Sequence, residues 1–178
     1  QEPDDFLDFQ NSGTGARIML GVLSGQNFTT KVTGDESLCS RPMDRIIHPL
    51  SRMGAIFCEL ENPGRLPMEV TGSSLESLTH TSPVSSAQVK SALILAGLVG
   101  GVPVSVSEPN CSRDHTERIL RMAGVSIVSH ESDGRWQIEL KSPESTMSAL
   151  DIEVPGDFSS AAFFVILALL GGIKDGLV

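Results

Sequence analysis

The sequence predicts an α/β fold made of repeated βαβαββ units around buried parallel helices, with the repeat incomplete at its ends. Three observations predict it. Three apolar segments look alike, a second pair of longer segments shares one order of motifs, and equivalent positions recur roughly 70 residues apart. A period of this length is typical of a repeated supersecondary unit.

The three apolar segments are each rich in glycine or alanine and are followed or ended by glycine. They are "ARIMLGVLSG" (16–25), "ALILAGLVGG" (92–101) and "FFVILALLGG" (163–172). A helix without a polar face is typically a buried helix, and small side chains let two such helices approach closely. We therefore expect three helices in the protein interior.

The second pair of similar segments comprises residues 40–70 and 112–140. Both begin with Ser-Arg, continue through an amphipathic helical pattern to Arg-Met and a glycine, and then give two strands around a Gly-Arg turn. Combined with the apolar segments, they define a unit of strand, buried helix, strand, amphipathic helix, strand and strand. In the complete copy, strands are predicted near 77–81, 102–107, 125–130 and 135–140, and helices near 86–99 and 114–123.

This period predicts one domain over residues 1–178. Its parts are a partial unit plus a second-half repeat over about 1–75, the complete unit over 76–142, and the start of another unit over 143–178. The chain opens on a predicted buried helix without a strand before it, and it stops soon after another buried helix. We therefore expect the chain to be a piece of a longer protein.

Composition excludes several classes of partner. The net charge is −9, aromatic residues make up 4% and tyrosine is absent, so no nucleic-acid partner is expected. The three cysteines match no metal or redox spacing, and the longest apolar run, 161–170, is too short to cross a bilayer. Because the N-terminal segment also has no signal-peptide pattern, we expect a cytoplasmic protein without a membrane partner.

The candidate functional residues stand at the predicted helix starts. Equivalent helices of a repeat point their N-termini the same way, so their free N–H groups line one surface that favours anions. Arg41 and Arg113 add positive charge there. Gly13 lets a ligand approach the backbone, while Ser86 and Gln88 add hydrogen-bonding groups. The sequence therefore predicts a surface for a small ligand that carries phosphate or carboxylate groups.

Simpler structural roles are open for several residues near these helix starts. Asp114 and Glu117 fit a capping box before the helix predicted at 114–123, and Ser86 fits an N-cap. Four other side chains fit solvated, ion-paired, loop or cap positions: Arg17, Asp35, Lys90 and His115.

The helix-start strings resemble motifs of the 5-enolpyruvylshikimate-3-phosphate synthase family, the 3-phosphoshikimate 1-carboxyvinyltransferases. The strings are "NSGTGAR", "GDESLCSRPM", "SSAQVKSALILAGL", "SRDHTERIL" and "VPGDFSSAAFF", and they cover essentially the whole chain in the family's order. The forms "SAQVKSA" and "SRDHTER" resemble the class II branch. The chain is similar to an internal fragment of such an enzyme.

The resemblance implies the inverse α/β barrel of the enolpyruvyl transferases, in which each of two domains holds three βαβαββ units. It implies transfer of the enolpyruvyl group of phosphoenolpyruvate to shikimate 3-phosphate, with release of phosphate, on the pathway to the aromatic amino acids. The inhibitor glyphosate occupies the phosphoenolpyruvate pocket of the family. No metal or organic cofactor is implied.

The resemblance also implies the site residues, motif by motif. Those for shikimate 3-phosphate are Ser86, Ala87 through its backbone, Gln88 and Arg113. Those for phosphoenolpyruvate and glyphosate are Asn11, Gly13, Thr14, Arg41 and Gln88. The family's proton-transfer groups match no residue of this chain, so no catalytic residue is assigned. The isolated chain is expected to be inactive, with the other segments of the enzyme as its partners.

Two alternatives stay open at this point. UDP-N-acetylglucosamine enolpyruvyl transferases share the architecture and carry a reactive cysteine five residues before the pocket arginine. Here that position is Glu36, whereas Cys39 stands two residues before Arg41. The other alternative is a non-catalytic domain that binds a phosphorylated ligand or completes a split enzyme.

Overall fold

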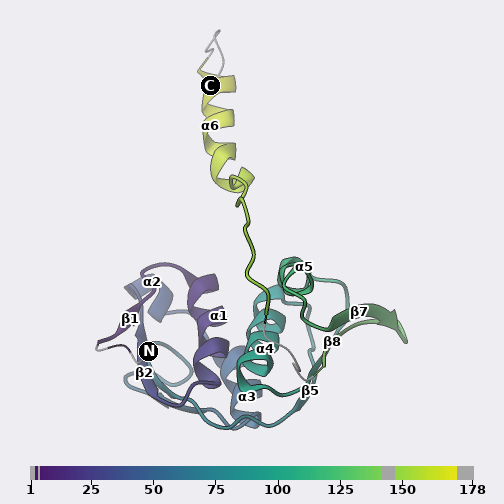
Figure 1. Ribbon diagram of the computed structural model, residues 1–178. Coiled ribbons are helices and arrows are strands. Elements are labelled where there is room, and N and C mark those ends of the chain that lie inside the picture. The colour runs from purple at the N-terminus through teal and green to yellow at the C-terminus, as the bar shows by residue number, and fades with distance from the viewer. Residues whose placement is uncertain (1–2, 4, 142–146, 172–178) are drawn as a thin grey trace. The chain divides into compact units, whose positions relative to one another are not determined.

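The computed structural model describes residues 3, 5–141 and 147–171, and its contacts divide the chain into two compact units, Gln1–Ser148 and Ala149–Val178. The first unit holds two successive copies of one arrangement (Figure 1).

The first copy contains a four-stranded sheet in the order β1-β2-β4-β3. Its elements are β1 (Leu7–Asp8), α1 (Gly13–Ser24), β2 (Thr29–Thr33), α2 (Glu36–Cys39), α3 (Asp44–Arg52), β3 (Ile56–Glu59) and β4 (Met68–Thr71). The first two strands of the sheet pair in parallel, and the other pairs are antiparallel.

The second copy repeats this topology with the order β5-β6-β8-β7 and the same parallel and antiparallel pairs. Its elements are β5 (Leu78–Thr81), α4 (Ala87–Gly100), β6 (Val104–Glu108), α5 (His115–Met122), β7 (Ile127–Ser132) and β8 (Arg135–Leu140). The α/β class and the βαβαββ unit predicted from the sequence are therefore confirmed, as is each helix and strand predicted for the complete copy.

Strand β1 was not expected, because the sequence analysis has the chain open on the helix. The strand is two residues long, and Leu7 and Asp8 pair with Val32 and Thr33 of β2. Two residues are too few to give an alternating apolar pattern, so only the pairing with β2 reveals the strand.

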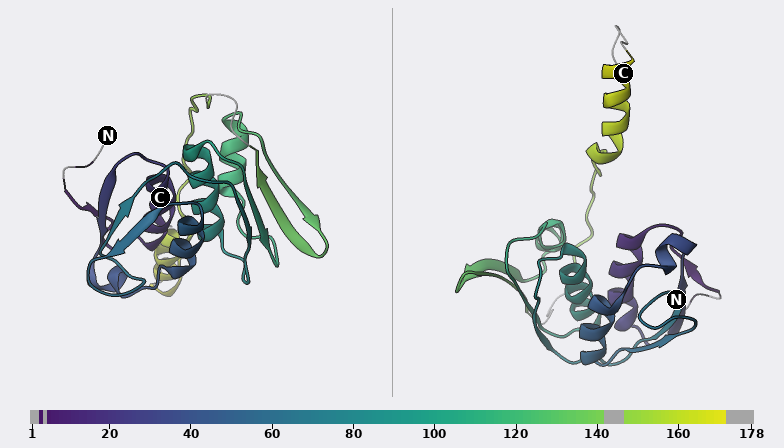
Figure 2. Two further views of the ribbon diagram at one scale, coloured as in Figure 1. Left: turned by 90° about the horizontal axis from the view of Figure 1, so that it is seen from below. Right: turned by 180° about the vertical axis from the view of Figure 1, so that it is seen from behind.

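Helices α1 and α4 lie side by side between the two sheets (Figures 1 and 2). They run parallel, because Thr14 meets Gln88 near their N-termini and Gly25 lies against Val99 near their C-terminal ends. A side chain at Gly21 would overlap the carbonyl oxygen of Ala92, which shows that the two backbones nearly touch. The glycine and alanine content of the apolar segments is therefore explained by close helix packing.

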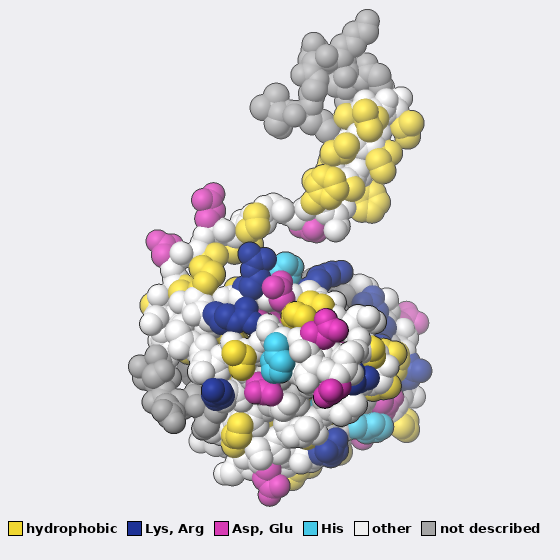
Figure 3. Space-filling model, turned by 90° about the vertical axis from the view of Figure 1, so that its right-hand side faces the viewer, with side chains coloured by type: hydrophobic (Ala, Val, Ile, Leu, Met, Phe, Trp, Pro, Cys, Tyr) yellow, Lys and Arg dark blue, Asp and Glu magenta, His cyan; other side chains and the backbone are white. Residues whose placement is uncertain are grey.

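The second unit contains helix α6 (Phe158–Leu170), whose N-terminus is capped by the side chain of Asp157. The sequence predicts a buried helix here, but none of the helix residues is buried. Figure 3 shows apolar side chains over the visible face of the helix. Burial is not observed because no other helix or strand is described within this unit. In the described part of the chain, no helix is both long and apolar enough to cross a membrane.

Candidate functional site

The start of helix α4 and the loop before α5 line two neighbouring cavities. The larger, about 440 Å³, is lined by Ser85, Ser86, Ala87, Gln88, Ser112 and Arg113. The smaller, about 160 Å³, is lined by Thr14, Ile18, Ala87, Gln88, Ser91, Arg113, His115 and Thr116. Three of the residues predicted to contact a ligand, Ala87, Gln88 and Arg113, line both cavities. Free N–H groups at the first turn of α4 favour an anion at this place.

Arg113 presents an unpaired positive charge to both cavities. Its side chain is exposed and forms no hydrogen bond or ion pair with any residue that the structure describes. Its backbone is held in place, since the carbonyl oxygen accepts a hydrogen bond of 2.9 Å from Lys90 Nζ. A fixed backbone and a free guanidinium suit a residue that binds a phosphate or carboxylate group.

Ser86 has a structural role as well as a place in the larger cavity. Its hydroxyl accepts a bond of 3.4 Å from the N–H of Val89 and so caps helix α4, as the sequence analysis allows. Its own N–H donates to Glu108 Oε2 at 3.1 Å. The residue is therefore bonded on both sides, which fixes the wall of the cavity.

A second group of cations converges on Gly13, the first residue of α1. A Cβ at Gly13 would lie 2.9 Å from Arg41 Nη1 and 3.1 Å from Arg17 Nη1. Burial lowers the pKa of Arg17, and the like charges of Arg45 and Arg41 lower it further. Within the described part of the chain, no carboxylate forms an ion pair with these arginines, and the repulsion among their guanidinium groups favours binding of an anion between them.

Asn11 connects this arginine cluster to a carboxylate. Its side-chain oxygen accepts a 2.7 Å bond from Arg41 Nη2, and its amide nitrogen donates to Asp35 Oδ2 at 2.7 Å. The Asn11 bond lowers the pKa of Asp35, and the N–H of Leu38 adds to this effect. Asp35 therefore caps α2 and also anchors the residue that orients Arg41.

Gln88 joins the two groups of predicted residues. Its Nε2 donates to Thr14 Oγ1 at 2.8 Å, and its Oε1 accepts from Arg17 Nη1 at 3.2 Å. The structure thus brings the predicted residues of α1 and α4 together across the helix pair. Asn11, Gly13 and Arg41 line neither of the two cavities, whereas Thr14 lines the smaller one.

Two residues differ from the structural roles that the sequence suggests. The capping box at α5 is wrong, because the side chain of Asp114 makes no cap hydrogen bond. Glu117 is fully buried and pairs with Lys90, 2.6 Å from Glu117 Oε1 to Lys90 Nζ. A buried ammonium attracts the carboxylate more strongly than the exposed N–H of a helix end does.

Arg17 lies at this site although its sequence position also fits a solvated or ion-paired side chain. It donates to Gln88 and to the carbonyl oxygen of Pro42. Its position four residues after Gly13 places both on one face of α1, which was a usable indication.

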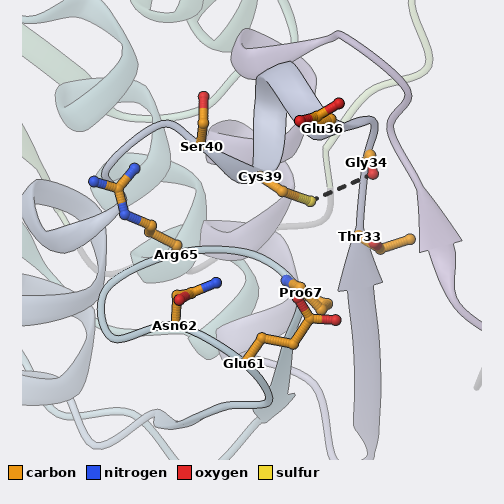
Figure 4. A pocket seen from close by; sticks show the side chains of 9 residues that line it. All are labelled: Thr33, Gly34, Glu36, Cys39, Ser40, Glu61, Asn62, Arg65 and Pro67. Atoms are coloured by element: carbon orange, nitrogen blue, oxygen red, sulfur yellow. Dashed lines mark hydrogen bonds between the residues drawn. The ribbon is translucent and has the colours of Figure 1, made fainter.

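A third cavity, about 550 Å³, lies next to the segment that carries Arg41 (Figure 4). It is lined by Thr33, Gly34, Glu36, Cys39, Ser40, Glu61, Asn62, Arg65 and Pro67. The thiol of Cys39 donates to the carbonyl oxygen of Gly34 at 3.3 Å within it. The thiol is thus bonded to the backbone, and Glu36 stands five residues before Arg41, where UDP-N-acetylglucosamine enolpyruvyl transferases carry their reactive cysteine.

Relatives of known identity resemble the chain over nearly its whole length. The 3-phosphoshikimate 1-carboxyvinyltransferase of Geotalea uraniireducens is 47% identical over 169 residues, which are 95% of this chain and 38% of that protein. The enzyme of the same name from Bacillus subtilis is 45% identical over 165 residues, 93% of this chain and 37% of that protein. The chain therefore spans about two fifths of the length of the curated relatives it matches.

A solved structure of EPSP synthase from Acinetobacter baumannii superposes with a TM-score of 0.80 at 41% identity, covering 94% of this chain and 37% of that one. The fold class, including the repeated unit of the enolpyruvyl transferases, is thereby confirmed. A family model described as EPSP synthase (3-phosphoshikimate 1-carboxyvinyltransferase) matches residues 1–174. On the motifs, the fold and these matches together, the chain belongs to the EPSP synthase family.

Proposed function

We propose that this chain forms part of both substrate sites of an enzyme that transfers the enolpyruvyl group of phosphoenolpyruvate to shikimate 3-phosphate. The observation that carries the proposal is the unpaired guanidinium of Arg113, which lines two cavities together with Ala87 and Gln88. Membership of the EPSP synthase family supplies the reaction and the identity of the two ligands.

Shikimate 3-phosphate is proposed to bind at the start of α4. The ligand carries a phosphate and a carboxylate, and Arg113 offers a planar donor that suits either group. Ser86 and Gln88 offer side-chain hydrogen bonds, and Ala87 offers its backbone at the helix N-terminus. The larger cavity, about 440 Å³, is of the size that small-molecule sites have.

Phosphoenolpyruvate, and glyphosate in its place, are proposed to bind beside the first turn of α1. Arg41 and Arg17 supply the positive charge around Gly13, and the absence of a side chain at Gly13 leaves room for the ligand. Asn11 and Thr14 set the positions of Arg41 and Gln88 through their hydrogen bonds. We assign Gln88 a contact with both ligands. Its hydrogen bonds to α1 support this assignment, because they place it between the two proposed sites.

In the proposed reaction, the 5-hydroxyl oxygen of shikimate 3-phosphate forms a bond to C2 of phosphoenolpyruvate. The hydroxyl group loses its proton, the bond between C2 and the phosphate oxygen breaks, and inorganic phosphate leaves with one proton taken up in exchange. The residues of this chain hold the two anions next to each other, which reduces the entropy cost of their encounter. The proton transfers are proposed to use groups in the portion of the enzyme that this chain does not match.

The test is a titration of the 178-residue chain followed by NMR, with shikimate 3-phosphate, phosphoenolpyruvate and glyphosate added separately and together. We expect shikimate 3-phosphate to shift the amide signals of Ser86, Ala87, Gln88 and Arg113. Phosphoenolpyruvate and glyphosate are expected to compete for the signals around Gly13. Shifts that avoid all of these residues for every ligand would contradict the proposal.

The Arg113→Ala variant tests the proposed role of this arginine quantitatively. Loss of a charge-assisted contact costs about 1.5–3 kcal/mol, so binding of shikimate 3-phosphate should weaken roughly tenfold or more. The matched control is Arg118→Ala, because Arg118 is an exposed arginine of α5 that lines neither cavity. Equal affinities in the two variants would show that Arg113 is only a surface residue.

A further inference from the structure

Beneath the proposed shikimate 3-phosphate site lies a buried cluster of three charged side chains, Lys90, Glu108 and Glu117, each at most 1% exposed. They come from three different elements: α4, the end of β6, and α5. Lys90 lies 2.6 Å from Glu117 and 3.8 Å from Glu108, measured from its ammonium nitrogen to a carboxylate oxygen. None of the three lines either cavity, so none is placed to touch a ligand there.

The cluster is bonded to the backbone of the site on both sides of the cavity. Glu108 Oε2 accepts from the N–H of Ser86, while Glu108 Oε1 accepts from the N–H and the hydroxyl of Ser112, at 3.0 and 2.6 Å. Lys90 donates to the carbonyl oxygen of Arg113. The charged cluster therefore sets the distance between the helix start at Ser86 and the loop that carries Arg113.

Lys90 is the member on which the others depend. Among the described residues, Glu117 has no partner for its carboxylate other than Lys90. Lys90 also carries the only positive charge against two carboxylates in this cluster. Two buried carboxylates without a cation are strongly unfavourable, so loss of Lys90 is relieved by moving Glu108 or Glu117 toward water. Movement of Glu108 would release the Ser112 and Arg113 loop.

We propose that Lys90 is a positioning residue for shikimate 3-phosphate, which acts by holding the Arg113 loop against the start of α4. This inference rests on the proposed function for the identity of the ligand. Loss of Lys90 is expected to affect ligand binding on the Arg113 side of the site. The Gly13 and Arg41 side is held by separate hydrogen bonds through Asn11.

The experiment compares the 178-residue chain with its Lys90→Met variant and with Lys31→Met as the matched control. Lys31 is a half-exposed lysine that pairs with Glu69 at 3.7 Å on the first sheet, so the control removes an ion pair of the surface. Two quantities are measured: the affinity for shikimate 3-phosphate by NMR titration, and the hydrogen-exchange rates of the Ser86 and Ser112 amides, which both donate to Glu108.

In Lys90→Met we expect faster exchange of the Ser112 amide, and affinity for shikimate 3-phosphate reduced toward the roughly tenfold loss of Arg113→Ala. The double variant Lys90→Met with Arg113→Ala should bind no more weakly than Arg113→Ala alone, because Lys90 acts through Arg113. A general structural role would instead lower the melting temperature, leave the affinity of the folded protein unchanged, and give additive losses. That result would overturn the proposal.

Glu117→Gln gives a second variant if Lys90→Met does not fold. It keeps the shape of the side chain and leaves Glu108 as the one carboxylate partner of Lys90 in this cluster. The Lys90 ammonium should then move away from the Arg113 carbonyl, which weakens binding of shikimate 3-phosphate. Unchanged affinity and unchanged exchange in this variant would also overturn the proposal. If the unmodified chain binds no shikimate 3-phosphate, the proposed function fails for this chain, whereas the exchange rates still decide whether Lys90 holds the loop.

Discussion

Single residues of the candidate site combine a structural hydrogen bond with a place in the wall of a cavity. Ser86 caps α4 and lines a cavity, and Arg113 is fixed through its carbonyl oxygen while its guanidinium stays unpaired. Residue types at helix starts were enough to predict both as candidates, because capping and anion binding use the same N–H groups. The partner of Glu117 was not predictable, since Lys90 comes close to it only through the tertiary packing of α4 against α5.

Gly13 has no side chain, and this leaves space between two arginines of the candidate site. A methyl group there would press on Arg41 and Arg17, which are the flexible ends of side chains, and not on backbone. Gly13 is not among the glycines with positive φ, so alanine fits its helical backbone conformation. The substitution is therefore expected to change the ligand pocket and not the fold.

We predict that Gly13→Ala weakens glyphosate inhibition much more than it raises the Michaelis constant for phosphoenolpyruvate. Glyphosate is the longer of the two ligands, so its binding is weakened more by a methyl group and by displaced guanidinium groups. The measurement uses a chimeric synthase in which this chain replaces the matched portion of the Bacillus subtilis relative. Both constants and the melting temperature are determined on one preparation, and equal losses for the two ligands with a lower melting temperature would refute this explanation.

At the scale of the elements, the repeat was predictable and its details were not. Two copies of the unit give sheets with the same strand order and the same pairing directions, which the period of the motifs indicated. Long, uniformly apolar segments such as α4 are predictable from their own length and composition. Strand β1 is determined by its partner β2, and a strand of two residues carries no pattern of its own.

The contact of α1 with α4 is the element-scale feature that holds the two halves of the site together. Thr14 and Gln88 can bond only because Gly21 lets the two helices meet at the backbone of Ala92. We predict that Gly21→Ala destabilises the protein by about 1–3 kcal/mol, because the added methyl overlaps backbone that cannot rotate away.

Urea unfolding followed by the fluorescence of Trp136, the one tryptophan of the chain, measures this change. Gly156→Ala is the matched control, because a methyl group there meets no atom within 4 Å. Gly21→Ala should also weaken the binding of both ligands, because they are proposed to lie on the two sides of Gln88. Stability equal to that of the control would mean that the helix pair tolerates a wider separation than its packing implies.

At the scale of the whole molecule, the residues of the candidate site come from two copies of a repeat, and the family match extends over residues 1–174. The relatives are much longer, with 37–40% of their length covered. The apolar side chains of α6 find no partner within their own unit, although their composition predicts burial. Burial of such a helix depends on a partner outside the helix, which its own sequence does not specify.

The last prediction concerns the activity of these 178 residues as an isolated polypeptide. We expect binding of at least one anionic ligand but no measurable release of phosphate from phosphoenolpyruvate and shikimate 3-phosphate. Positioning by Arg113, Arg41 and Gln88 brings the reactants together, whereas the reaction also needs groups that donate and accept protons. The residues assigned to the proposed substrate sites supply arginines, amides and hydroxyls. Two carboxylates near these sites are already engaged, Asp35 by Asn11 and the N–H of Leu38, and Glu108 by the N–H groups of Ser86 and Ser112. His115 lines the smaller cavity but is not assigned a role in proton transfer. Addition of polypeptides that cover the unmatched portions of the Bacillus subtilis relative should restore phosphate release, and Arg113→Ala in this chain should reduce the restored rate at low shikimate 3-phosphate. Full turnover by the isolated chain would mean that its own residues carry the proton transfers, and Asp35→Asn would then be the first variant to examine.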